Sequence, residues 1–112
     1  MDIQLIKTDD LTKVVLEGRL DTASVDIVEL KFTAGIVAPG KPAIIDMSNV
    51  TFLGSMGIRM LLSAAKGLLG RGASLALFGA TPSILETMET ALLTDIIPVF
   101  GNEDAAISAV TA

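Results

Sequence analysis

The chain has 112 residues, about half of them hydrophobic, with a net charge of −5, four Phe as its only aromatic residues, and no cysteine or histidine. Disulfides, thiolate–zinc sites, imidazole bases and Ser-His-Asp triads are therefore excluded, and we expect a single domain over residues 1–112 that is not an enzyme and holds no metal or cofactor. The eight basic residues form no run, which argues against a nucleic-acid partner.

The first part of the chain predicts a hairpin followed by a helix. Residues 2–7 alternate in polarity as a strand does, and residues 12–16 form a second, β-branched run. Because a short polar turn joins them, we expect an antiparallel pair. Asp21 then suits a helix cap, and a helix is predicted over 23–37.

The remaining sequence alternates short apolar runs with helical patterns. Pro42 to Met47 is apolar without interruption, as in a strand covered on both faces, and the polar pair Ser48-Asn49 is expected to end it. The expected elements are strands at 42–47, 73–78 and 96–100, and helices at 55–69, at 82–93 and after Asn102. This order predicts an α/β fold with a mixed, mainly parallel β-sheet, an N-terminal antiparallel hairpin strand and about four helices.

The predicted helix at 55–69 has apolar residues on two sides. Helical spacing gives a core face made of Ile58, Leu61, Leu62, Ala65, Leu68 and Leu69. The other side contains Met56, Met60, Ser63 and Gly67, flanked by Arg59 and Lys66. Methionine is adaptable and frequent on binding surfaces, so this side is either a docking face for a partner or is covered by another part of the chain.

Ser55 stands where this helix is expected to begin. A serine there can cap the helix by accepting a hydrogen bond from a free backbone N–H group. It can equally carry a phosphate, because helix N-termini favour anions. The residues alone leave both roles open.

Two segments resemble the signatures of STAS domains, the anti-sigma factor antagonist family. Residues 18–21 read G-R-L-D and resemble the family pattern G-E-[LIV]-D. Residues 45–59 read I-D-M-S-N-V-T-F-L-G-S-M-G-I-R and resemble D-L-S-x-V-x-[FY]-[IM]-D-S-[ST]-G-[LI]-[GR]. The likeness extends to the order and length of the elements over nearly the whole chain.

The resemblance implies a partner switch. Ser55 matches the serine that an anti-sigma factor with serine kinase activity phosphorylates in this family, which ends binding until a serine phosphatase restores it. Asp21 matches an acid near this serine that contacts the partner. Asp46 matches a more structural aspartate, and Gly57 a glycine that lets the helix approach closely. The expected partner-binding residues are Asp21, Met56, Gly57, Arg59, Met60 and Ser63, with Ser55 as the phosphorylation site.

Three residues differ from the family pattern. Gly54 stands where the family usually has Asp, Met56 replaces a second hydroxyl residue, and Arg19 replaces Glu. Gly54 removes a charge that a kinase could use for positioning. The alternative function is therefore a STAS subunit of a transporter or signalling assembly that is never phosphorylated.

Location and assembly follow from what the sequence lacks. No apolar run reaches the ~18 residues of a spanning helix, and the first residues do not resemble a signal peptide. We expect a cytoplasmic protein without membrane insertion. Exposed apolar residues on the predicted helices also make a homodimer an open possibility.

Overall fold

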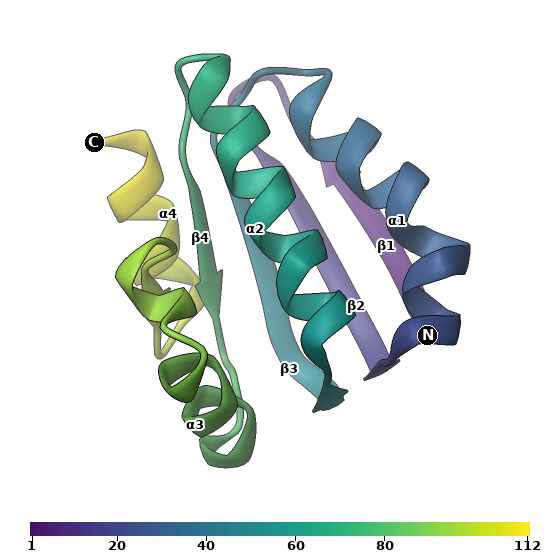
Figure 1. Ribbon diagram of the computed structural model, residues 1–112. Coiled ribbons are helices and arrows are strands. Elements are labelled where there is room, and N and C mark those ends of the chain that lie inside the picture. Colours follow the sequence, from purple (N-terminus) through teal and green to yellow (C-terminus); the bar gives the residue numbers. More distant parts are fainter.

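The computed structural model describes residues 1–112 and contains one five-stranded sheet (Figure 1). Its strands follow the order β1-β2-β3-β4-β5 across the sheet; β1 and β2 are antiparallel and all other neighbours are parallel. The strands are β1 (Asp2–Lys7), β2 (Thr12–Leu20), β3 (Ala43–Leu53), β4 (Leu75–Phe78) and β5 (Val99–Phe100). The predicted mixed, mainly parallel sheet with an antiparallel N-terminal strand is confirmed.

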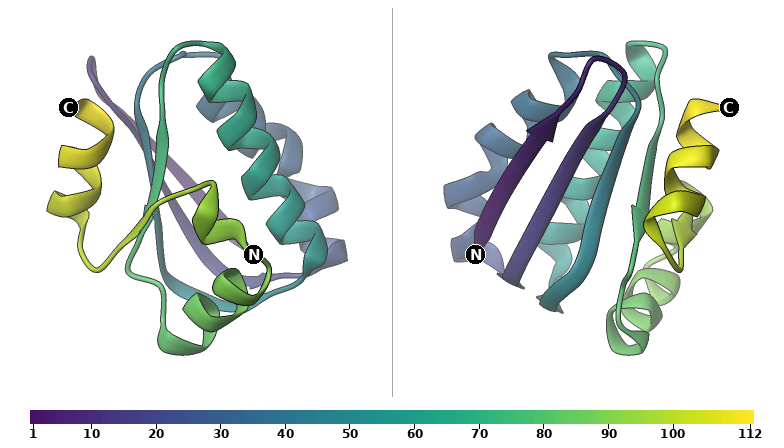
Figure 2. Two further views of the ribbon diagram at one scale, coloured as in Figure 1. Left: turned by 60° about the vertical axis from the view of Figure 1, so that its left-hand side comes forward. Right: turned by 180° about the vertical axis from the view of Figure 1, so that it is seen from behind.

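Four helices cover the sheet from both sides, as Figure 2 shows. They are α1 (Thr22–Val37), α2 (Ser55–Gly70), α3 (Pro82–Thr90) and α4 (Glu103–Thr111), with a short 3-10 turn at Leu93–Asp95. α1 and α2 lie together on one face, and α4 packs alone against the other face of β3 and β4. None of the helices has the length and apolar character needed to cross a bilayer.

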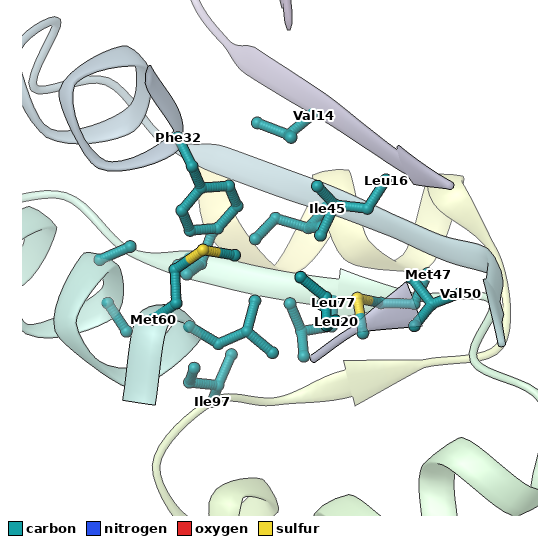
Figure 3. Close-up of a cluster of buried hydrophobic side chains, with 14 of the residues drawn as sticks. Val14, Leu16, Leu20, Phe32, Ile45, Met47, Val50, Met60, Leu77 and Ile97 are labelled. Carbon is teal, nitrogen blue, oxygen red and sulfur yellow. The ribbon is translucent and has the colours of Figure 1, made fainter. Parts of the chain in front are cut away.

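The core is divided by the sheet into a large and a small part. The large part contains 23 buried residues between the sheet and α1, α2 and α3, including Phe32 and Met60 (Figure 3). The small part lies under α4 and consists of Ile44, Ala76, Phe78, Ala106 and Val110. An ion pair of 2.7 Å between Lys13 Nζ and Glu103 Oε1 also joins β2 to the start of α4.

The largest difference from the sequence prediction lies in β3. The strand was expected to end at Ser48-Asn49, but it continues to Leu53. Its pairing with β4 stops at Asp46, whereas its pairing with β2 continues to Leu53. Because Ser48 and Asn49 lie beyond the reach of β4, their side chains are exposed within a strand, and their polarity does not mark its end.

The other strand and helix ends differ in similar ways. β2 extends past the predicted end at residue 16 to Leu20, following β3. β5 is shorter than predicted, since it follows Pro98, which has no N–H group for a sheet ladder. The helix expected over 82–93 ends at Thr90. The extension of β2 and β3 matters most, because it determines where α1 and α2 begin.

Candidate functional site

The N-termini of α1 and α2 lie beside each other at one edge of the sheet (Figure 1). The parallel strands β2 and β3 end on paired residues, Leu20 and Leu53, and a helix follows each of them almost at once. The backbone N–H of Gly54 donates to the carbonyl oxygen of Leu20 at 3.0 Å, which joins the two connections. Asp21 and Ser55, which are distant in sequence, are thereby brought to the same edge, where ligands of α/β sheets commonly bind.

Gly57 allows the start of α2 to lie close against this edge. A Cβ atom at this position would lie 2.9 Å from Leu20 Cβ, 2.9 Å from Leu53 Cδ1 and 3.1 Å from the Leu20 carbonyl oxygen. Any side chain would therefore push α2 away from β2. Since Gly57 is itself buried, it positions the neighbouring residues and does not form part of the exposed surface.

Ser55 is the first residue of α2 and does not cap it, so the predicted capping role is wrong. The capping position belongs to Gly54, which has extended backbone angles (φ −94°, ψ 179°) and no side chain to offer. This follows from the length of β3, which runs to Leu53 and leaves one residue before the helix. The Ser55 side chain is exposed, and no side chain hydrogen bonds to the first turn of α2.

Asp21 caps α1 as predicted. Its Oδ1 atom accepts a hydrogen bond from the backbone N–H of Ser24 at 3.0 Å. That bond, together with a hydrogen bond from the Ser24 side chain and the nearby Arg19 guanidinium, lowers the pKa of the Asp21 carboxyl below its usual value. Arg19 Nε lies 3.5 Å from Asp21 Oδ2, and its guanidinium also stacks 4.3 Å from the centre of the Phe52 ring. The carboxylate is thus held in a charged state at the surface.

Met60 does not lie on the exposed side of α2, and this prediction is wrong. Its side chain is fully buried and points into the main core, which includes Phe32 of α1 (Figure 3). The core face of α2 is made of Gly57, Met60, Leu61, Ala64, Ala65 and Leu68. Leu69, predicted as core, is 60% exposed.

The packing of α1 against α2 explains this rotation of the core face. A Cβ at Gly67 would lie 2.9 Å from Val37 Cγ2 at the end of α1, so this side of α2 meets another helix and not solvent. A helix packed against both a sheet and a neighbouring helix needs an apolar arc wider than one stripe. Of the two alternatives for the methionines, coverage by the same chain therefore applies to Met60.

The other predicted docking residues do lie at the surface. Met56 is partly exposed, and its sulfur accepts a hydrogen bond from Arg59 Nη1 at 3.8 Å. Arg59 and Ser63 are exposed on the following turns of α2. The exposed site, called here the switch surface, consists of Asp21, Ser55, Met56, Arg59 and Ser63.

A hollow of about 530 Å³ opens beside Ser55 between α2 and α3. Ser55 and Ile58 line it from α2, and Ser83, Glu86, Thr87 and Thr90 line it from α3. These α3 residues were not predicted from the sequence, although the hydroxyl groups at 83, 87 and 90 recur at helical spacing on one face. No basic residue lines the hollow. Arg59, the basic residue one turn after Ser55 on α2, lies outside it.

Comparison with known proteins assigns the family. The family model for the STAS domain matches residues 2–106. A protein of Bordetella bronchiseptica named as a candidate anti-sigma factor antagonist, BtrV, is 25% identical over 109 residues, which are 97% of this chain and 94% of that protein.

Two solved structures have a similar fold. The anti-sigma factor antagonist of Mycobacterium paratuberculosis has a TM-score of 0.88 at 25% identity, over 99% of this chain and 94% of that one. The Bacillus anti-sigma factor antagonist SpoIIAA, in its unphosphorylated form, has a TM-score of 0.79 at 20% identity, over 96% and 95%. Together with the family match over nearly all of its length, these similarities show that the chain belongs to the STAS domain family.

Proposed function

We propose that this anti-sigma factor antagonist-like STAS protein is a partner switch that operates through reversible phosphorylation of Ser55. The observation that carries the proposal is the exposed Ser55 hydroxyl on the first turn of a helix that no side chain caps. The partner is an anti-sigma factor with serine kinase activity, and a serine phosphatase reverses the modification.

A phosphate at Ser55 would change the surface and leave the fold intact. It adds roughly −1.5 to −2 charges at neutral pH. The first backbone N–H groups of a helix have no partner within the helix, and the helix dipole favours negative charge at this end. Since Ser55 takes part in no side-chain cap, its modification removes no structural hydrogen bond from α2.

A partner bound to the switch surface would respond strongly to that charge. Met56 offers apolar surface next to Ser55, so a partner that packs there must remove water from any phosphate. Glu86, which lines the hollow on the other side of Ser55, adds like charge to the same region. The phosphorylated surface is thus poorly suited to the partner that the unmodified surface binds.

The relatives support this assignment. BtrV is named as a candidate anti-sigma factor antagonist, and SpoIIAA has been solved both unphosphorylated and phosphorylated with the same overall fold as this chain. Asp21 lies at the same sheet edge as Ser55, as expected for an acid that meets the same partner.

Binding to the host's anti-sigma factor tests the proposal with three variants. Ser55→Ala should bind as wild type does, whereas Ser55→Asp, which introduces a negative charge, should bind at least about tenfold more weakly. Ser108→Asp is the matched control, because Ser108 is an exposed serine on α4, across the sheet from the switch surface. Equal affinities for Ser55→Asp and Ser108→Asp would refute the switch.

A second candidate, a STAS subunit that is never phosphorylated, is favoured by Gly54. This residue supplies neither the acid usual in the family nor a cap for α2. The intact mass of the protein isolated from its own host distinguishes the two candidates. A fraction heavier by one phosphate, localised to Ser55 by peptide mapping, supports the switch; unmodified protein in cells that contain the active kinase supports the subunit.

A further inference from the structure

The outer face of α1 carries a row of apolar side chains with no partner in the chain. Ile27 and Leu30 are 81% and 83% exposed, the two most exposed large hydrophobic residues of the protein. Ala23 and Ala34, one turn before and one turn after, are also exposed. The opposite face of α1 already supplies the core residues Val25, Val28, Phe32 and Ile36. α1 is therefore apolar on both faces, and only one of them is used within the domain.

The spacing of this outer row is that of a two-stranded coiled coil. Residues 23, 27, 30 and 34 are separated by four, three and four positions, which places Ile27 at position a and Leu30 at position d of a heptad. A β-branched residue at a combined with leucine at d favours two parallel strands. The stripe, defined here as Ala23, Ile27, Leu30 and Ala34, thus has the pattern of a helix that pairs with a copy of itself.

The charges that flank the stripe favour the same partner and orientation. In this heptad register Asp26 occupies position g and Lys31 position e, five residues later. In a parallel pair these two positions face each other across the interface, so that each copy contributes one acid and one base. In an antiparallel pair that sets Ala23 opposite Ala34, position g faces position g, so Asp26 would lie nearest Thr33 of the second copy and would gain no opposite charge. Neither residue forms an ion pair within its own chain.

The position of α1 in the fold leaves this face accessible. α1 is the outermost helix at the β1 side of the sheet, and the one helix beside it is α2 (Figures 1 and 2). The core residues of α1 point toward the sheet, so the stripe points away from the domain. A second copy can approach without displacing any element.

We infer that this face of α1 is a self-association surface, through which two copies pair as parallel helices about a two-fold axis. The helix has 16 residues, so the stripe provides about two heptads and a small interface. We expect a weak dimer, with a Kd on the order of 10–100 μM, in rapid exchange with monomer. Because the axis runs along α1, both switch surfaces lie at the same end of the dimer.

Sedimentation velocity from about 1 μM to 1 mM tests the inference. The wild type should show a concentration-dependent monomer–dimer equilibrium, and Leu30→Glu should raise the Kd at least about tenfold. Leu69→Glu is the matched control, since Leu69 is an exposed leucine on α2 outside the stripe. A monomer at every concentration, or a dimer that Leu30→Glu leaves unchanged, would overturn the inference.

Two further experiments test the orientation. Asp26→Lys should weaken the dimer, and Asp26→Lys combined with Lys31→Asp should restore it, because the exchange recreates the pairs only in a parallel arrangement.

The chain has no cysteine, so Ala23→Cys introduces a single thiol. In a parallel pair the two thiols face each other and should form a disulfide under oxidation. In an antiparallel pair each thiol would face Ala34 of the other copy, and no disulfide would form. Cross-linking below that of an exposed-site control, Ser108→Cys, would contradict the parallel pair. None of these results depends on Ser55, so the dimer and the switch can fail separately.

Discussion

The N-termini of α1 and α2 lie next to each other at the edge of the sheet, and they differ in capping. At α1, Asp21 accepts a hydrogen bond from the first turn and is held charged by its surroundings. At α2, Gly54 provides no cap, and Ser55 is exposed beside the hollow between α2 and α3. The N-terminus of α1 thus has a side-chain cap, and the N-terminus of α2 has none. α1 therefore contributes a charged carboxylate to the site, whereas α2 contributes an uncharged hydroxyl, the group that the proposed switch would phosphorylate.

The largest effect on the pair of N-termini is expected when the start of α2 is pushed away from the end of β2. Gly57→Ala places a methyl group within 2.9 Å of Leu20 and Leu53, and we expect it to lower the free energy of unfolding by about 2 kcal/mol. Urea denaturation measures this. Gly70→Ala, in the same helix but with no atom within 4 Å of the added Cβ, should be neutral or slightly stabilising. Equal effects at both glycines would mean that close approach is not the function of Gly57.

Removing the side chains of Asp21 and Ser55 in turn tests the difference in capping between α1 and α2. Asp21→Ala should lower the melting temperature measurably, because it removes the cap of α1 and its favourable charge. Ser55→Ala should stay within about 0.5 kcal/mol of wild type, since Ser55 makes no capping bond. Thermal unfolding followed by circular dichroism compares the two. A loss for Ser55→Ala as large as that for Asp21→Ala would show that Ser55 stabilises α2 after all.

A cap can also be added where α2 lacks one. Gly54→Asp puts a good capping residue at this position, and we expect a gain of roughly 0.5 kcal/mol in the free energy of unfolding. The backbone there is extended, and the added Cβ meets the edge of the partly exposed Phe52 ring at 3.1 Å and the Leu20 carbonyl oxygen at 3.6 Å. Gly54→Ala serves as the control, since it adds the Cβ without the carboxylate. If Gly54→Asp is no more stable than Gly54→Ala, the backbone N–H groups in the first turn of α2 gain nothing from a capping carboxylate.

The smallest effect concerns the charge of Asp21. Its pKa is lowered in the folded state, so the charge stabilises the protein above the unfolded value of about 3.8, and this contribution is lost as the pH falls through the folded pKa. Asp21→Asn keeps a capping oxygen and removes the charge. The stability difference between wild type and Asp21→Asn should therefore be present at pH 7 and shrink below about pH 3.8. A difference that is constant down to pH 2.5 would contradict this origin.

The features predicted correctly from the sequence are those encoded locally. The order of the elements, the Asp21 cap and the placing of Ser55 at the start of a helix follow from periodicity and capping chemistry. The family signature around Ser55 could be recognised because it is a contiguous pattern, and the family itself is confirmed.

The features that were missed depend on neighbours distant in sequence. β3 continues past Ser48-Asn49 because β2 pairs with it there, and Met60 is buried because α1 covers that side of α2. The hollow between α2 and α3 depends on how two helices meet, which the helical spacing of neither one reveals. In each case the deciding contacts lie between elements, and the pattern within one element does not contain them.

We propose that phosphate on Ser55, and not a change of fold, ends partner binding. The most direct measurement is the affinity of the anti-sigma factor for wild-type protein before and after stoichiometric phosphorylation by that factor, with the circular dichroism spectrum recorded for both forms. We predict an affinity at least about tenfold weaker, an unchanged spectrum, and recovery of binding after phosphatase treatment. Equal affinity of the two forms, or transfer of phosphate to the Ser55→Ala variant at the wild-type rate, would contradict the account.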